Sequence, residues 1–329
     1  MIKVENLTKK YGNHIAVNNL SFEVQKGQIY GFLGPNGAGK STTMNMMTGY
    51  LAATSGTVTI NGYDMSTQPE QAKKCIGYLP EIPPLYPDMT VLEYLRFVAE
   101  LKKVPKRERD EQLQELMKMV GIDDVKMRLI KNLSKGYKQR VGLAGAVIGY
   151  PEVIILDEPM VGLDPKQIIE IRGLIKNLSK QHTILLSSHI LSEISTICDH
   201  ILIIANGALV ASDSPEGLQK LMDKSIEIEI TALGTKEKAE EVLTGIELVQ
   251  SYTLEEAVEE NGITLKVTTK DNADIRKELS VALTNADMPV LSMKKIEKSL
   301  EDIFLQLTDA SGEAGAEEDI EEESDDSDL

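Results

Sequence analysis

Residues 34–42 read Gly34-Pro35-Asn36-Gly37-Ala38-Gly39-Lys40-Ser41-Thr42, and this stretch decides the fold because it is a complete G-x-x-x-x-G-K-S phosphate loop. Its glycines let the backbone curl so that successive N–H groups point at phosphate oxygens. Lys40 supplies a charge for the β- and γ-phosphates, and Ser41 supplies a hydroxyl for Mg²⁺. A short apolar strand at 28–33 and a helix at 41–50 flank the loop in the order that the motif requires. The stretch predicts a nucleoside triphosphate as ligand, against the alternative of a glycine-rich turn that binds nothing.

A second signal lies at residues 153–159, Val-Ile-Ile-Leu-Asp-Glu-Pro, which form an apolar strand ending in two carboxylates. Asp157 is placed to hold Mg²⁺ and its water shell beside Ser41. Glu158 is placed to orient and polarise a water molecule for attack on the γ-phosphate. Such a pair also occurs in ordinary solvated turns, but its place downstream of a phosphate loop favours the catalytic interpretation.

The pattern along residues 1–220 predicts an α/β fold with three parts. Alternating apolar residues in the first 30 positions and at 57–60 predict antiparallel β-hairpins. After Thr90, apolar residues at helical spacing predict a helical insert. Continuous apolar runs at 153–156 and 183–186 are typical of strands buried on both faces. A predicted helix at 167–179 lies between them in the sequence. We expect a P-loop NTPase core with an antiparallel β subdomain and a helical insert.

The pattern changes near residue 220, where we predict a domain boundary. Residues 221–308 contain predicted elements in the order β-α-β-β-α-β, which is typical of a small ferredoxin-like α+β domain. Residues 309–329 form a separate tail, because positions 311–329 hold ten acidic side chains and no Lys or Arg. A run of like charges with Ser and Gly is expected to be disordered. We interpret it as a solubilising tail, with docking on a basic partner as the alternative.

Composition excludes several classes of protein. The formal net charge of −17 argues against nucleic-acid binding, which needs a basic surface, and against adhesion to anionic lipid. No run approaches the roughly 18 apolar residues that a membrane span needs. The first residues lack the apolar segment of a signal peptide, so a cytosolic protein is expected. Cys75 and Cys198 lack metal-ligand spacing and are interpreted as small core residues rather than redox groups.

Four further motifs follow a fixed order around the phosphate loop, and together they resemble the ATP-binding subunits of ABC transporters. Residues 133–140, Leu-Ser-Lys-Gly-Tyr-Lys-Gln-Arg, lie where that family has its L-S-G-G-Q signature. Residues 162–165, Gly-Leu-Asp-Pro, are similar to its D-loop, and residues 187–189, Ser-Ser-His, to its switch histidine. Tyr11 lies about where the family stacks an aromatic ring on adenine. The resemblance covers residues 2 to about 215.

The resemblance implies an ATPase that works as a head-to-tail pair, with ATP and Mg²⁺ held between the phosphate loop of one subunit and the signature of the other. Ser134 and the Gly136 backbone would meet the γ-phosphate, and Asp164 of the D-loop would join the nucleotide contacts. Ser134 would also serve as a plain helix N-cap. His189 would contact the γ-phosphate and hold the attacking water together with Glu158. The remaining histidines are interpreted as surface or packing residues, namely His14, His182 and His200.

Two departures from the family pattern matter. Lys135 and Tyr137 replace a Gly and the final Gln of the signature, while the two phosphate-facing positions are kept. Glu81 stands where the family has a Gln that touches Mg²⁺ and couples hydrolysis to the membrane subunit. A carboxylate there either binds Mg²⁺ more strongly or swings away. Our hypothesis is that Glu81 joins Ser41 and Asp157 as a ligand on the Mg²⁺ side.

We therefore predict an ATP-hydrolysing subunit that pairs with a second copy or a relative and powers a separate transmembrane permease. It would lie on the inner face of the membrane through that permease. Residues 82–88 are expected to contact the permease, with packing against the helical insert as the alternative. The variant motifs and the extra domain resemble bacterial export systems, including multidrug and gliding-motility-like ones.

Two other functions fit the sequence less well. A soluble mechanochemical ATPase acting on ribosomes or nucleic acid fits less well, because the chain has one phosphate loop, no long heptad run and an acidic charge. A regulator that binds ATP without hydrolysis would need a defective carboxylate pair, and Asp157 and Glu158 are both intact.

Overall fold

The computed structural model describes residues 1–221, 226–257, 262–270, 273–296 and 304. The chain divides into two compact units, one that contains Met1–Pro215 and, of the later described residues, Phe304, and one formed by Glu216–Ile303. Helix α8 (Pro215–Leu221) contains residue 220, where the sequence predicts the domain boundary. The predicted acidic tail, 309–329, lies outside the described residues.

A six-stranded sheet with the order β10-β9-β3-β8-β7-β6 forms the centre of the first unit. Five strands are parallel, from β9 through β6, and β10 pairs antiparallel with β9. Strands β3 and β7 are buried at every position, as their apolar runs predict. The strands span Ile29–Leu33 (β3), Ile76–Leu79 (β6), Val153–Leu156 (β7), Thr183–Ser188 (β8), His200–Ala205 (β9) and Ala208–Asp213 (β10).

The parallel register brings three loops to one edge of this sheet. Leu33 pairs with Ser188 at the ends of β3 and β8, and Leu156 pairs with Leu186 where β7 meets β8. The chain therefore leaves all three strands at the same edge, which is where α/β sheets bind ligands. The phosphate loop follows β3, the two carboxylates follow β7, and His189 follows β8.

An antiparallel sheet with the order β2-β1-β4-β5 forms the β subdomain. Strands β1 and β2 form one hairpin that closes where Tyr11 pairs with His14, so its strands are longer than the sequence pattern predicts. Asn61 and Gly62 both have positive φ, 49° and 86°, and turn β4 into β5 as an Asn-Gly pair does. The strands span Ile2–Tyr11 (β1), His14–Val24 (β2), Ser55–Ile60 (β4) and Tyr63–Asp64 (β5).

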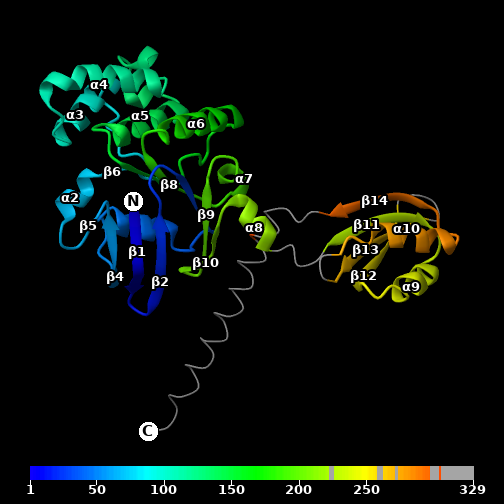
Figure 1. Cartoon of the computed structure of the whole chain (residues 1–329). Helices are drawn as coiled ribbons and strands as arrows, with labels where there is room; N and C mark the ends of the chain where they lie inside the picture. Colours follow the sequence, from blue (N-terminus) through cyan, green and yellow to red (C-terminus); the bar gives the residue numbers. More distant parts are fainter. Residues whose placement is uncertain (222–225, 258–261, 271–272, 297–303, 305–329) are drawn as a thin grey trace, which may run out of the picture. The chain divides into compact units, whose positions relative to one another are not determined.

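Helices of the first unit cover the sheets and build the helical insert, and α3, α4 and α5 lie together beyond the central sheet (Figure 1). Helix α3 begins with a capping box, in which Thr90 accepts the N–H of Glu93 and the Glu93 carboxylate accepts the N–H of Thr90. Leu101, the last residue of α3, continues the apolar spacing of the helix but is 64% exposed. The helices span Lys40–Met47 (α1), Pro69–Lys74 (α2), Val91–Leu101 (α3), Lys106–Met119 (α4), Lys135–Val147 (α5), Pro165–Leu178 (α6) and Leu191–Ile194 (α7).

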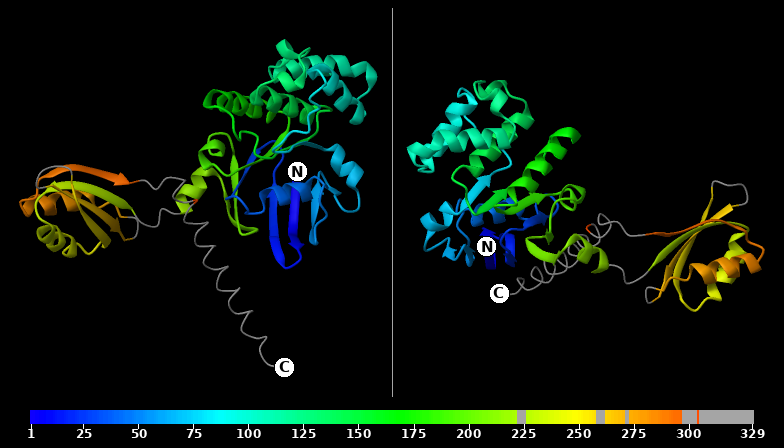
Figure 2. Two further views of the ribbon diagram at one scale, coloured as in Figure 1. Left: turned by 180° about the vertical axis from the view of Figure 1, so that it is seen from behind. Right: turned by 45° about the horizontal axis from the view of Figure 1, so that its top comes forward.

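The second unit has the element order β-α-β-β-α-β and a four-stranded antiparallel sheet with the order β12-β13-β11-β14. Helices α9 and α10 contact each other and lie on the same face of that sheet (Figure 2). Its core is aliphatic, with Ile228, Ile230 and Leu265 of the strands in one cluster with Leu279 of α10. The elements span Glu227–Leu233 (β11), Lys236–Thr244 (α9), Val249–Glu256 (β12), Gly262–Thr269 (β13), Arg276–Asn285 (α10) and Val290–Ile296 (β14).

Within the described residues, no helix combines the length and the apolar character that crossing a membrane requires.

Replacing Thr90 with Ala removes the capping hydroxyl of α3 and is expected to lower the free energy of unfolding of the first unit by about 1 kcal/mol. Urea unfolding followed by circular dichroism measures this loss. Thr90→Ser keeps the hydroxyl and is the control. If both variants lose the same stability, the cap is not the cause.

Candidate nucleotide-binding site

The phosphate loop passes so close to neighbouring backbone that two of its positions accept only glycine without strain. Gly39, immediately before α1, has a φ of 96°, and a Cβ there would lie 2.5 Å from the carbonyl oxygen of Ala16. A Cβ on Gly34 would lie 2.5 Å from the carbonyl oxygen of Ile204. These approaches seat the loop between β2 and β9. The first turn of α1 contains no acidic residue, so its N–H groups present a positive helix end to the loop.

Lys40 carries its charge into the middle of this loop and is only 6% exposed. Its Nζ donates to the carbonyl oxygens of Gly34 at 2.8 Å and Pro35 at 3.2 Å. The same Nζ lies 3.4 Å from Oε1 of Glu158. The loop therefore holds the lysine head where the motif requires a point charge for the β- and γ-phosphates.

The carboxylate pair after β7 is fixed by one hydroxyl. Ser187 Oγ donates to Oδ1 of Asp157 at 2.6 Å and accepts the backbone N–H of Glu158 at 2.8 Å. Glu158 adopts a φ of 47°, which is strained for a residue with a side chain and occurs most often at functional sites. Its Oε2 lies 3.0 Å from Nδ1 of His189, so the two oxygens of this carboxylate face a lysine and a histidine.

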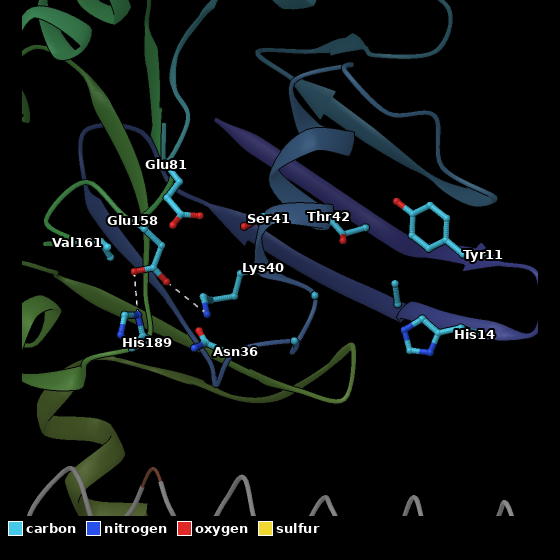
Figure 3. Close-up of a pocket in the computed structure, with 13 residues that line it drawn as sticks. Tyr11, His14, Asn36, Lys40, Ser41, Thr42, Glu81, Glu158, Val161 and His189 are labelled. Atoms are coloured by element: carbon cyan, nitrogen blue, oxygen red, sulfur yellow. Dashed lines mark hydrogen bonds and ion pairs between the residues drawn. The ribbon is translucent and has the colours of Figure 1, made fainter. Parts of the chain in front are cut away.

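Lys40, Glu158 and His189 line one pocket of about 490 Å³, whereas Asp157 is buried behind it and is not a lining residue. Lys40, Glu158 and His189 lie close together at one end, and Tyr11 and His14 lie at the other (Figure 3). Tyr11 is 50% exposed and offers a ring face for stacking, as the sequence predicts for an adenine contact. Further predicted residues line the pocket between the two ends, namely Asn36, Gly37, Gly39, Ser41, Thr42 and Glu81.

The predicted residues Gly34, Pro35 and Ala38 are not among the lining residues. The carbonyl oxygens of Gly34 and Pro35 accept hydrogen bonds from Lys40 instead. Three lining residues were not predicted as part of the site, namely His14, Ala16 and Val161. His14, expected to be a surface or packing residue, is exposed and lines the pocket next to Tyr11, and Val161 lines it beyond Glu158. The sequence feature that could have indicated His14 as a pocket residue is its position across the hairpin turn from Tyr11, with which it pairs.

The other two histidines have packing contacts that match their interpretation. His182 is buried, with Nδ1 2.6 Å from the carbonyl oxygen of Pro151. His200 Nε2 lies 3.0 Å from Oγ of Ser212.

The signature and D-loop residues do not line this pocket. Ser134 is the N-cap of α5, because its Oγ accepts the N–H of Tyr137 at 3.4 Å. Asp164 is the N-cap of α6, because its Oδ1 accepts the N–H of Gln167 at 2.9 Å. Gly136 lies against the side chain of Gln167, so closely that a Cβ would be 2.7 Å from it. Within one chain the structure therefore shows the capping role of Ser134 and keeps all three predicted residues away from the phosphate loop.

The donors beside the loop fit Mg²⁺. Asp157 is buried, and its Oδ2 accepts no hydrogen bond from the described residues, while Oδ1 is taken by Ser187. Ser41 and Glu81 line the pocket nearby. Mg²⁺ is usually held by one or two carboxylates with a hydroxyl, water and substrate phosphates rather than by a cage of protein groups. No cluster of three or more His, Cys, Asp or Glu that would hold a metal ion occurs in the described part of the chain.

The fold and this pocket define a P-loop ATPase. The family described as "ABC transporter" matches residues 17–161. The ABC transporter ATP-binding protein YdbJ of Bacillus subtilis is 34% identical over 96% of this chain and 98% of its own length. The bacitracin transport ATP-binding protein BcrA of Bacillus licheniformis is 35% identical over 93% of this chain and 97% of its own. The chain belongs to the ATP-binding subunits of ABC transporters, whose activity is the hydrolysis of ATP.

Solved structures agree with this assignment. An ATP-binding subunit of an ABC transporter superposes with a TM-score of 0.62 at 31% identity, over 67% of this chain and 92% of that one. A dimeric bacterial ABC transporter cassette superposes with a TM-score of 0.60 at 26% identity, over 65% of this chain and 99% of that one. A post-hydrolysis state of that cassette, bound to ADP and phosphate, matches equally well.

Replacing Lys40 with Ala removes the charge next to the transferred phosphate and is expected to lower ATP hydrolysis by about 100-fold or more. Release of phosphate from ATP measures this loss. Lys176→Ala, on the exposed surface of α6, is the matched control and should hydrolyse ATP normally. Normal turnover in Lys40→Ala would show that the loop does not hold the reacting phosphate.

Proposed function

We propose that this chain is the ATP-hydrolysing subunit of a bacterial export system and that it drives a separate transmembrane permease. The observation that carries the catalytic part is the position of the Glu158 carboxylate, with Lys40 at 3.4 Å on one side and His189 at 3.0 Å on the other. A carboxylate held in this way beside a phosphate loop suits a water molecule in line with the γ-phosphate. In this proposal Glu158 orients that water and His189 holds both the water and the phosphate.

The export role is supported by which relatives match the whole chain. BcrA matches 93% of it, and the linearmycin resistance ATP-binding protein LnrL of Bacillus subtilis matches 94% at 31% identity. Both matches extend beyond the first unit and include most of the second. Resistance through a transporter requires outward movement of the toxic compound. We infer that the chain serves the same direction of transport.

The active site is proposed to be shared between two chains. Ser134 and Gly136 stand at the N-terminus of the 13-residue helix α5, whose N–H groups suit the γ-phosphate. They do not line the pocket of their own chain, and neither does Asp164. A head-to-tail partner, either a second copy or a related subunit, would bring them to the nucleotide. The similarity to a dimeric cassette supports this arrangement.

Mg²⁺ is proposed to be held by Ser41 and Asp157, with Glu81 as a further ligand on the same side. When bound, the ion would neutralise charge that develops on the phosphates. The Glu81 side chain points from the loop after β6 toward the space between Glu158 and Ser41 (Figure 3). Its negative charge would add to that of Asp157 and Glu158. Glu81 would therefore offer Mg²⁺ a charged carboxylate oxygen where the family pattern has the neutral amide oxygen of a Gln.

The permease is proposed to dock where the segment 82–88 meets the helical insert. Ile82 is 83% exposed and Tyr86 is 50% exposed, so this segment leaves apolar surface open to a partner. A groove of about 630 Å³ next to them is lined by Tyr50, Pro84 and Phe97, among others. This docking would hold the subunit on the inner face of the membrane.

Glu158→Gln keeps the shape of the side chain but removes the base, so the variant is expected to bind ATP and accumulate as a nucleotide-bound dimer. Size-exclusion chromatography with and without ATP measures the dimer, and phosphate release measures turnover. Adding Lys40→Ala to the same chain should abolish the dimer, because nucleotide no longer binds. Turnover at the normal rate in Glu158→Gln would overturn the assignment of the base.

Glu81→Ala is expected to raise the Mg²⁺ concentration needed for half-maximal hydrolysis and to weaken the stimulation of hydrolysis by the permease. Glu81→Gln, which restores the usual residue of the family, separates the need for a charge from the need for a polar side chain. The Mg²⁺ dependence of ATPase activity, with and without permease, is the measurement. If Glu81→Ala changes neither, Glu81 is not a ligand.

A further inference from the structure

A second pocket of about 490 Å³ adjoins the nucleotide pocket. Glu81 and Val161 line both of them and form the wall that they share. Beyond that wall, the second pocket is bounded by the loop after β6 and by the first turns of α5. It therefore lies between the loop after β6, the segment at Val161 and the first turns of α5.

Three lysines line this second pocket, and two of them have no counter-charge. Lys131 forms an ion pair with Asp88 at 2.9 Å. The side chains of Lys135 and Lys138 form no hydrogen bond or ion pair with any residue that the structure describes. The Lys135 Nζ packs against Gly162 of the D-loop, at the place that a Cβ of that glycine would occupy. Glu81 contributes the one acidic side chain among the lining residues.

A buried amide also faces this pocket without a partner. Gln139 lines it, is only 5% exposed, and its side chain makes no hydrogen bond to the described residues. In the described part of the chain, the fully buried side-chain polar atoms without a partner are Gln112 Oε1 and Arg172 Nε, so the Gln139 amide atoms meet the solvent of the pocket and are available to a ligand. The amide N–H₂ donates to an oxyanion, as the lysines do.

The apolar part of the lining strengthens the attraction for an anion. Pro83, Leu85 and Ile130 contribute to the wall, and Ile130 is fully buried. Low polarity around a charge weakens solvent screening, so half-buried Lys138 attracts an anion more strongly than exposed Lys135 does. The pocket also adjoins the N-terminus of α5, where the helix end is positive.

We propose that this second pocket binds phosphate oxyanions and receives the inorganic phosphate that hydrolysis produces in the adjoining nucleotide pocket. The inference rests on the proposed function for its source of phosphate. Glu81, at the shared wall, repels the free dianion, and Lys135 and Lys138 are the unpaired cations beyond it. No bond forms or breaks in this step, because the phosphate only moves from one pocket to the next.

The first experiment measures phosphate binding while the phosphate loop is filled. The full chain is saturated with Mg²⁺ and a non-hydrolysable ATP analogue, and radiolabelled inorganic phosphate is added in equilibrium dialysis. One phosphate per chain should bind, with affinity about fivefold weaker or more in Lys138→Gln and in Lys135→Gln. Gln139→Leu should weaken it as well. The control Lys176→Gln should match the unaltered chain.

Absence of phosphate binding under these conditions would overturn the proposal, and so would equal affinity in the pocket variants and the control.

The second experiment separates this proposal from the proposed function. Quenched-flow kinetics report the cleavage of ATP, and a fluorescent phosphate sensor reports the release of phosphate from the protein. Lys138→Gln should slow release relative to cleavage. If the unaltered chain cleaves no ATP, the proposed function fails while the binding result stands on its own. If cleavage and release slow together in Lys138→Gln, the residue does not act on product release and the proposal is wrong.

Phosphate groups of lipids are a second source of the same chemistry. Co-sedimentation with phosphatidylglycerol vesicles tests it directly. Vesicle binding that Lys138→Gln reduces, together with unchanged phosphate release, would assign the pocket to a lipid headgroup and contradict the product-phosphate proposal. Equal vesicle binding by the variant and the unaltered chain is the expected result.

Discussion

The parallel register of β3, β7 and β8 is the constraint on which the rest of this structure depends. The three strands end at one edge of the central sheet, so Lys40, Glu158 and His189 meet although they are far apart in the sequence. Side chains alternate between the faces of a strand, and a shift of register by one residue would reverse them. Because β3 and β7 are buried at every position, such a shift would also break the core.

The charged side chains at this edge of the sheet have few hydrogen-bonding partners. We interpret them as groups that act on the nucleotide and add little to the stability of the fold. Lys40 and Glu158 are both more than nine-tenths buried, and taking two such charges out of water costs several kcal/mol per ion. Two loop carbonyls and His189 offset part of that cost. The strained backbone of Glu158 adds to it. An arrangement of this kind is held in place by the surrounding fold, and Ser187 is the hydroxyl that links its two carboxylate positions.

Much of the fold followed from local patterns whose physical cause is plain. Buried parallel strands appear as continuous apolar runs, and the Asn-Gly pair at Asn61-Gly62 is by itself a turn signal. Strand and helix ends were less predictable. Helix α4 begins at Lys106, directly after Pro105, several residues before its apolar stripe, because polar residues fill its first turns. Such ends depend on tertiary contacts, which periodicity does not contain.

The residues of the site also include some that the sequence predicted and some that it did not. The motifs predicted which residues would stand at the sheet edge, since each motif follows one strand. They did not reveal Ser187 as the link between Asp157 and Glu158, because a hydrogen bond across two strands has no local signal. Nor did they indicate the unpaired Gln139 or the pocket that it lines, which arise where three separate segments meet.

The central claim is that each active site needs two chains, and mixing two inactive variants tests it most directly. Lys40→Ala disables the phosphate loop, and Ser134→Ala disables the signature, so each variant alone should hydrolyse little ATP. A mixed pair contains one site with both defects and one site with neither. The account predicts that mixing restores a substantial part of the activity. Activity of the mixture no greater than that of the two separate variants would contradict it.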